Sequence, residues 1–116
     1  MRLAVGIAAG WLLAGCATTS GGQVVPGTPR GITFGGGDGV DCARRVIIQG
    51  AQNEQAGVGA EYAWLRAKYP GYRRGLQALT KCDGKPADKL SIQTAAGQAL
   101  DIYFDISGFF GKGFGL

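Results

Sequence analysis

Residues 89–106 read KLSIQTAAGQALDIYFDI, and this stretch decides the fold. Apolar and polar side chains alternate on both sides of the central AAGQ segment: Leu90 and Ile92 before it, Ile102 and Phe104 after it. Successive side chains of a strand point to opposite faces. The alternation therefore predicts two neighbouring strands, with one apolar face and one polar face.

The preceding segments predict the remaining elements. The run ARRVIIQG is rich in β-branched residues and predicts a strand over 43–49. Asn53 is a good N-cap, and Pro70-Gly71 stops the helix that we expect to run to about Tyr69. A strand over 72–82 follows, and Asp83-Gly84 is a turn signal.

The predicted fold class is α+β, in a single small domain with the order β-α-β-β-β. The last three strands form an antiparallel meander, and the helix packs on one face of it. Val58, Tyr62, Leu65 and Tyr69 lie at helical spacing, so we expect them to face the sheet.

The N-terminus reads MRLAVGIAAGWLLAGC. Arg2 precedes an uncharged run of about 13 residues, whereas a membrane-spanning helix needs about 20. A short apolar run behind a positive start is typical of a signal peptide. Its end, LAGC at 13–16, is similar to the bacterial lipobox, which implies cleavage before Cys16 and acylation of that cysteine.

This resemblance implies a lipid-anchored protein of the bacterial cell envelope, with a signal peptide over 1–15. Two or three acyl chains anchor stably, whereas a single chain binds only marginally. In lipoproteins of this kind an Asp after the acylated cysteine resembles an inner-membrane retention signal. Residue 17 is Ala here, so the resemblance implies the outer membrane, on its periplasmic face.

Residues 16–37 contain the expected lipidated Cys16 and a segment rich in Gly, Ser, Thr and Pro. This composition predicts a flexible tether with a reach of about 25 Å. The small α+β domain is then expected over 38–116.

Composition excludes several function classes. The formal net charge of +4 falls by one with the loss of Arg2, and the basic residues are scattered, so we expect no nucleic-acid partner. The chain contains no histidine, which excludes Ser-His-Asp and Cys-His catalysis and any histidine-ligated metal. We predict no cofactor, no metal site and no enzymatic activity.

With Cys16 assigned to lipid, Cys42 and Cys82 remain as a candidate disulfide pair in an oxidising compartment. If the strands over 43–49 and 72–82 are parallel neighbours, the two cysteines lie a strand length apart, about 20–30 Å. A bridge needs Cα atoms within about 7 Å. Either the pair is unbridged, or the first strand lies elsewhere in the sheet.

Three longer stretches are GDGVDCARRVIIQGA, GAEYAWLRAKYPGY and IYFDISGFFGKGFG. They resemble a group of small, uncharacterised bacterial proteins that share GDG-x-x-C, EY-x-W-L/I, YPGY and YFDIS-x-FFGK. The resemblance covers about 36–114 and implies no known activity.

The order helix, YPG, strand, DG turn, strand and YFD strand over 54–105 also looks like PepSY-type or related inhibitor-like domains. That resemblance implies protease inhibition or protein binding outside the cytoplasm.

Aromatic residues are the candidate partner contacts. Trp64 lies off the predicted apolar helix face, so it either anchors a partner or lies under a second layer. Tyr103 belongs to the polar sheet face. Phe109, Phe110 and Phe114 either pack on the domain or form an exposed apolar patch.

These features favour a non-enzymatic, lipid-anchored module that binds an envelope protein or component. The alternative is a PepSY-like inhibitor of an extracytoplasmic hydrolase. A third hypothesis is a small thiol-dependent enzyme that uses Cys42, whose pKa Arg44 and Arg45 would lower.

Overall fold

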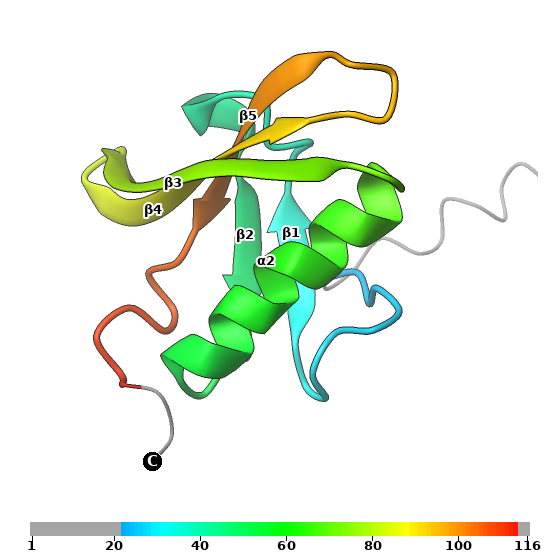
Figure 1. The fold of residues 1–116 in the computed structure, drawn as a ribbon. Helices are drawn as coiled ribbons and strands as arrows, with labels where there is room; N and C mark the ends of the chain where they lie inside the picture. The colour runs from blue at the N-terminus through cyan, green and yellow to red at the C-terminus, as the bar shows by residue number, and fades with distance from the viewer. Residues whose placement is uncertain (1–21, 114–116) are drawn as a thin grey trace, which may run out of the picture.

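The structure is a computed structural model that describes residues 22–113. Its elements are β1 (Thr33–Gly36), the 3-10 helix η3 (Cys42–Arg44), β2 (Val46–Gln49), α2 (Glu54–Lys68), β3 (Arg73–Cys82), β4 (Lys85–Gln93) and β5 (Ala99–Asp105). The strands form one mixed sheet in the order β1-β2-β5-β4-β3, and α2 lies across one of its faces (Figure 1). The predicted α+β class is confirmed, and so is the antiparallel meander of β3, β4 and β5.

The meander is longer than predicted but has the predicted orientation. Asp83 and Gly84 both adopt positive φ, 54° and 77°, at the two-residue turn between β3 and β4. Such a turn suits the twist of a tight hairpin. Leu90, Ile92 and Ile102 are buried, as the alternation predicts.

Strand β2 lies beside β5 and not beside β3. Its pairing with β5 is parallel and short, with Val46 opposite Phe104 and Ile47 opposite Asp105. The beginning of β2 therefore lies next to the end of β5. This offset decides where Cys42 lies.

The predicted tether is wrong for residues 22–37, because the structure places part of this segment in the sheet. Strand β1 pairs antiparallel with β2, with Phe34 opposite Ile48. On its other side, Phe34 exchanges two backbone hydrogen bonds with Gln23, of 2.8 and 2.9 Å. The folded domain therefore begins before residue 38. Residues 16–21 lie outside the described part of the chain.

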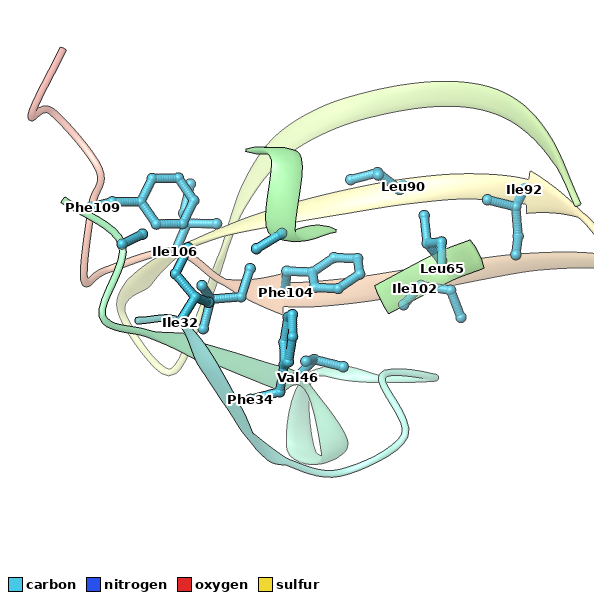
Figure 2. Close-up of a cluster of buried hydrophobic side chains, with 13 residues drawn as sticks. Ile32, Phe34, Val46, Leu65, Leu90, Ile92, Ile102, Phe104, Ile106 and Phe109 are labelled. Carbon is cyan, nitrogen blue, oxygen red and sulfur yellow. The ribbon is translucent and has the colours of Figure 1, made fainter. Parts of the chain in front are cut away.

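Burial of Ile32 and Phe34 explains why a Gly-rich segment folds here. Both are nearly inaccessible to solvent. Burying a large apolar side chain contributes roughly 1.5–3 kcal/mol, which offsets the conformational entropy of the flanking glycines. The core joins β1, β2, β4, β5 and the helix, as Figure 2 shows; its labelled members are Ile32, Phe34, Val46, Leu65, Leu90, Ile92, Ile102, Phe104, Ile106 and Phe109.

Helix α2 has the predicted bounds. The side chain of Asn53 accepts a hydrogen bond of 2.8 Å from the backbone N–H of Ala56, as expected of an N-cap. The last helical residue, Lys68, comes two residues before Pro70.

The predicted apolar face of α2 is confirmed only in part: Leu65 is buried, Tyr62 and Tyr69 are partly buried against the core, and Val58 is half-buried. The buried residues of the helix are Gly57, Ala60, Glu61, Ala63 and Leu65. Small residues let the helix approach the sheet closely. At Gly57 a Cβ atom would overlap the ring of Phe109, so the aromatic ring occupies the space that a side chain would fill. The predicted face did not include Glu61, which is also buried.

Candidate functional site

Strand β3 forms an open edge of the sheet. It has ten residues and pairs with β4 on one side, and no other strand of residues 22–113 pairs with it. All of its residues are exposed except Thr80 and Cys82. The register shifts between Arg74 and Gln77, as in a β-bulge. A long exposed edge presents unpaired backbone donors and acceptors, which can accept another strand.

Large apolar side chains line this edge. Leu76 is 81% exposed and Leu79 is 59% exposed, and Phe110 from the C-terminal loop is 50% exposed. Leu79 and Phe110 belong to a surface hollow of about 600 Å³; its lining residues are Leu79, Thr80, Lys81, Gly84, Pro86 and Phe110. We call β3 with this hollow the β3 edge surface.

Basic residues mark both ends of β3. Arg73 and Arg74 begin the strand, Lys81 lies near its end, and all three are exposed. The guanidinium carbon of Arg74 lies 3.9 Å from the centre of the Tyr62 ring on α2. The edge surface therefore has an apolar middle between positive ends.

A second cavity, of about 250 Å³, adjoins the β3 edge surface. We call it the Asp88 cavity, because Asp88 is the acidic residue of its sheet wall; its lining residues are Glu54, Val58, Gln77, Leu79, Asp88, Ile106, Phe109 and Phe110. The walls come from α2, β3, β4 and the C-terminal loop. Two acidic side chains and no basic side chain line it.

Polar contacts hold Asp88 at the cavity. Asp88 is only 6% exposed, and its Oδ2 accepts a hydrogen bond of 3.2 Å from Nε2 of Gln77. The hydroxyl of Tyr62 donates in turn to Oε1 of Gln77, at 3.4 Å. Gln77 therefore links the carboxylate of Asp88 to the exposed surface near β3.

Glu61 lies next to Asp88 on the helix side and is 0% exposed. Neither of its carboxyl oxygens accepts a hydrogen bond from a donor group of the described residues. Burial, and then a hydrogen bond with the carboxyl of Asp88 and the charge of that group, raises the pKa of Glu61 from 4.5 to about 10. Glu61 is thus a neutral carboxylic acid at pH 7, and its O–H group can donate to the carboxylate of Asp88.

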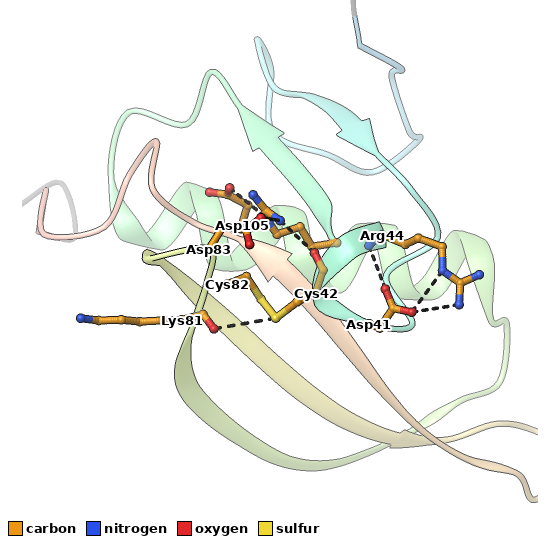
Figure 3. The surroundings of a disulfide bond; sticks show 8 residues. Asp41, Cys42, Arg44, Lys81, Cys82, Asp83 and Asp105 are labelled. Carbon is orange, nitrogen blue, oxygen red and sulfur yellow. Dashed lines mark hydrogen bonds and ion pairs between the residues drawn. A yellow bond between two sulfur atoms is a disulfide. The ribbon is translucent and has the colours of Figure 1, made fainter.

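The structure contains the candidate disulfide. Cys42 and Cys82 are bonded, with their Cα atoms 5.3 Å apart (Figure 3). The bridge forms because β2 begins beside the end of β5, which brings η3 to the end of β3. The expected separation of a strand length assumed that the two strands are parallel neighbours, whereas β5 and β4 lie between β2 and β3, so the alternative that the first strand lies elsewhere in the sheet is the correct one. The bonded sulfurs leave no thiol at Cys42 for the proposed thiol chemistry.

Arg45 reinforces the same junction. Its guanidinium donates to Asp105 at 3.2 Å and to Asp83 and the carbonyl of Cys42 at 3.1 and 2.8 Å. Burial opposes ionisation of Asp105, but hydrogen bonds from Ser107 and Arg45 hold its pKa below the usual value. The bridge and the ion pairs fix the β3–β4 hairpin to the turn before β2.

The predicted contact residues fall into different environments. Trp64 is half-buried and packs edge-on against Phe104, with ring centres 5.5 Å apart, so the sheet covers one side of it. Tyr103 is half-buried on the sheet face away from α2. Phe109 is part of the core, and Phe110 lies at both cavities. Phe114 and Cys16 lie outside the described residues.

The sequence analysis missed Leu76, Leu79, Glu61 and Asp88. Leu76 and Leu79 are three residues apart, which breaks the alternation of a strand because the bulge lies next to them. Glu61 follows Gly57 and Ala60 at helical spacing, and this run of small residues was the available signal of close helix packing. No signal connects Asp88 with Glu61, because the contact depends on tertiary structure.

No helix within residues 22–113 has the length and apolar character needed to cross a membrane. In the same part of the chain, no cluster of three or more His, Cys, Asp or Glu side chains is arranged to hold a metal ion. Comparison with protein-family models, curated proteins and solved structures finds no match to the chain in any of the three.

Proposed function

We propose that this chain is a non-enzymatic binding module of the bacterial cell envelope, anchored through acylated Cys16, that captures an extended segment of a partner protein at β3. The observation that carries the proposal is the ten-residue open edge with exposed Leu76 and Leu79. Strand addition supplies backbone hydrogen bonds to such an edge, and neighbouring apolar hollows supply specificity. Phe110, a predicted contact residue, extends the apolar surface.

Charge favours a partner with acidic residues over a second copy of the chain. Arg73, Arg74 and Lys81 are exposed at the ends of β3. Two copies of β3 paired antiparallel would bring Arg73 of one copy near Lys81 of the other, and like charges directly opposite each other are destabilising. An extended segment with acidic residues near its ends has the complementary pattern.

Photo-crosslinking in the acylated, full-length chain tests strand capture. We expect a photoreactive residue at Leu76 to crosslink to one extended segment of another envelope protein, mapped by mass spectrometry. Arg66, exposed on α2, provides the matched control position. Charge reversal of Arg73, Arg74 and Lys81 should abolish the crosslink, whereas reversal of Arg66 and Lys68 should preserve it. Equal crosslinking from both positions, or crosslinking to a second copy, contradicts the proposal.

The same experiment distinguishes the inhibitor hypothesis from the binding-module hypothesis. An inhibitor predicts that the crosslinked protein is a hydrolase and that its activity falls when the complex forms. A binding module predicts a complex without a change in enzymatic activity.

The anchor has its own test. Cys16→Ala should abolish labelling with palmitate and release the chain from the membrane fraction, because acyl chains supply the membrane affinity. Palmitate labelling that persists in Cys16→Ala contradicts the anchor. Fractionation of the unsubstituted chain then tests the outer-membrane assignment.

A further inference from the structure

We infer that the Asp88 cavity binds the alkylammonium group of a lysine side chain, supplied by the partner segment that lies along β3. Only the source of the lysine rests on the proposed strand capture. The cavity's preference for an alkylammonium group rests on its own shape and charge.

The cavity has the size of a single side chain. Its volume of about 250 Å³ lies below the roughly 300–1,000 Å³ of pockets that hold drug-sized ligands. Val58, Leu79, Phe109 and Phe110 supply apolar walls, against which the four-carbon stem of a lysine can pack. Gln77 and Leu79 belong to the exposed edge strand, so the cavity lies beside the edge that a partner strand would occupy.

The acidic groups of the cavity select a cation. Glu54 and Asp88 line it, and its lining contains no Lys or Arg. An ammonium carries three donors and no acceptor, so it supplies what these carboxyl groups lack. Anionic groups are excluded by the same charges.

The geometry favours lysine over arginine. One oxygen of Asp88 already accepts the amide N–H of Gln77, and one oxygen of Glu54 accepts the backbone N–H of Gly111 at 2.8 Å. A guanidinium binds best to a carboxylate that offers both oxygens side by side. A compact ammonium needs only the oxygen that remains free on each carboxylate.

Titration of the ¹⁵N-labelled full-length chain with n-pentylammonium at pH 7 tests the cavity without any partner strand. We expect saturable shifts at the Gln77 side-chain amide and at the backbone amides of Phe109 and Phe110. The neutral isostere n-pentanol should produce less than a tenth of these shifts. Equal responses to the two probes, or no saturable response to n-pentylammonium, overturn the inference.

Matched variants test whether the carboxylate of Asp88 binds the ammonium group. Asp88→Asn should weaken n-pentylammonium binding at least tenfold, whereas Asp101→Asn, on the opposite sheet face, should leave it unchanged. If Asp88→Asn does not fold, Phe110→Ala serves instead, since Phe110 is half-exposed and its loss should weaken binding several-fold. Binding that survives these cavity substitutions unchanged contradicts the assignment.

The mapped crosslink tests the source of the amine. The captured segment should carry a lysine opposite Gln77 or Leu79, and replacing that lysine with glutamine should weaken the complex at least tenfold. Crosslinking at Leu76 without amine binding would overturn the cavity and leave strand capture intact. Amine binding without crosslinking at Leu76 would overturn strand capture and leave the cavity assignment intact.

Discussion

The two edges of the sheet are built in opposite ways. Strand β1 has four residues, and Gln23 hydrogen-bonds to the outward backbone groups of Phe34. Strand β3 has ten residues and is exposed over most of its length, with no further strand beside it in residues 22–113. A protein avoids unwanted strand addition by covering or shortening an edge. The β1 edge is protected in this way, so the exposed β3 edge is the one that remains available for binding.

Truncation of one apolar residue on each edge should give the largest difference. Phe34→Ala should lower the free energy of unfolding by about 3–5 kcal/mol, since it leaves a cavity in the core. Leu79→Ala should change it by less than about 0.5 kcal/mol, because Leu79 is largely exposed. Urea denaturation of the two variants measures both values. Similar losses at the two positions would mean that β3 is covered in solution.

The disulfide joins the β1–β2 side of the sheet to the β3–β4 side. Cys42 precedes β2, whereas Cys82 ends β3. Replacing both with Ser should lower the free energy of unfolding by about 2–4 kcal/mol. In this variant the rate of backbone amide hydrogen exchange should increase most in β3 and β4 and least in β1 and β2. Uniform acceleration across the sheet would show that the bridge stabilises the whole domain equally.

The β1–β2 side and the β3–β4 side also differ in how well the sequence predicts them. The meander followed from alternation and a DG turn, and α2 from Asn53 and Pro70-Gly71, because these signals are local. Strand β1 was missed because its pairing with β2 depends on a distant segment, and only Ile32 and Phe34 mark it in a Gly-rich run. The disulfide depended on the offset of β2 along β5, which no local pattern encodes. Among the site residues, Phe110 was identified from composition, whereas the Glu61–Asp88 contact required the helix orientation.

Glycine positions on α2 test how closely the helix approaches the C-terminal loop beside the β3 edge. Gly57→Ala should lower the free energy of unfolding by about 1–3 kcal/mol, because the new methyl group overlaps Phe109. Gly59→Ala is the matched control. Its Cβ would meet Pro29 at an ordinary 3.7 Å, so the better helix propensity of Ala should raise stability by up to about 1 kcal/mol. If Gly57→Ala is also stabilising, Phe109 does not occupy that space in solution.

Glu61, on the β3 side of the domain, makes the free energy of unfolding depend on pH. Strand β1 contains no ionisable side chain and makes no such contribution. The pKa of Glu61 is about 10 in the folded chain against an ordinary value of 4.5, so the folded state retains a proton that the unfolded state releases. The stability contributed by Glu61 is therefore fully present below pH 4.5 and is lost progressively as pH rises toward 10, at up to about 1.4 kcal/mol per pH unit. Denaturation at pH 7 and 8 should show this loss in the unsubstituted chain. Glu61→Gln should remove it, because a neutral amide cannot ionise, whereas Glu54→Gln at the cavity rim should preserve it. If the loss of stability between pH 7 and 8 persists unchanged in Glu61→Gln, the pH dependence belongs to other groups. Glu61 would then be ionised in the folded chain, and its buried charge would require a cation within the domain.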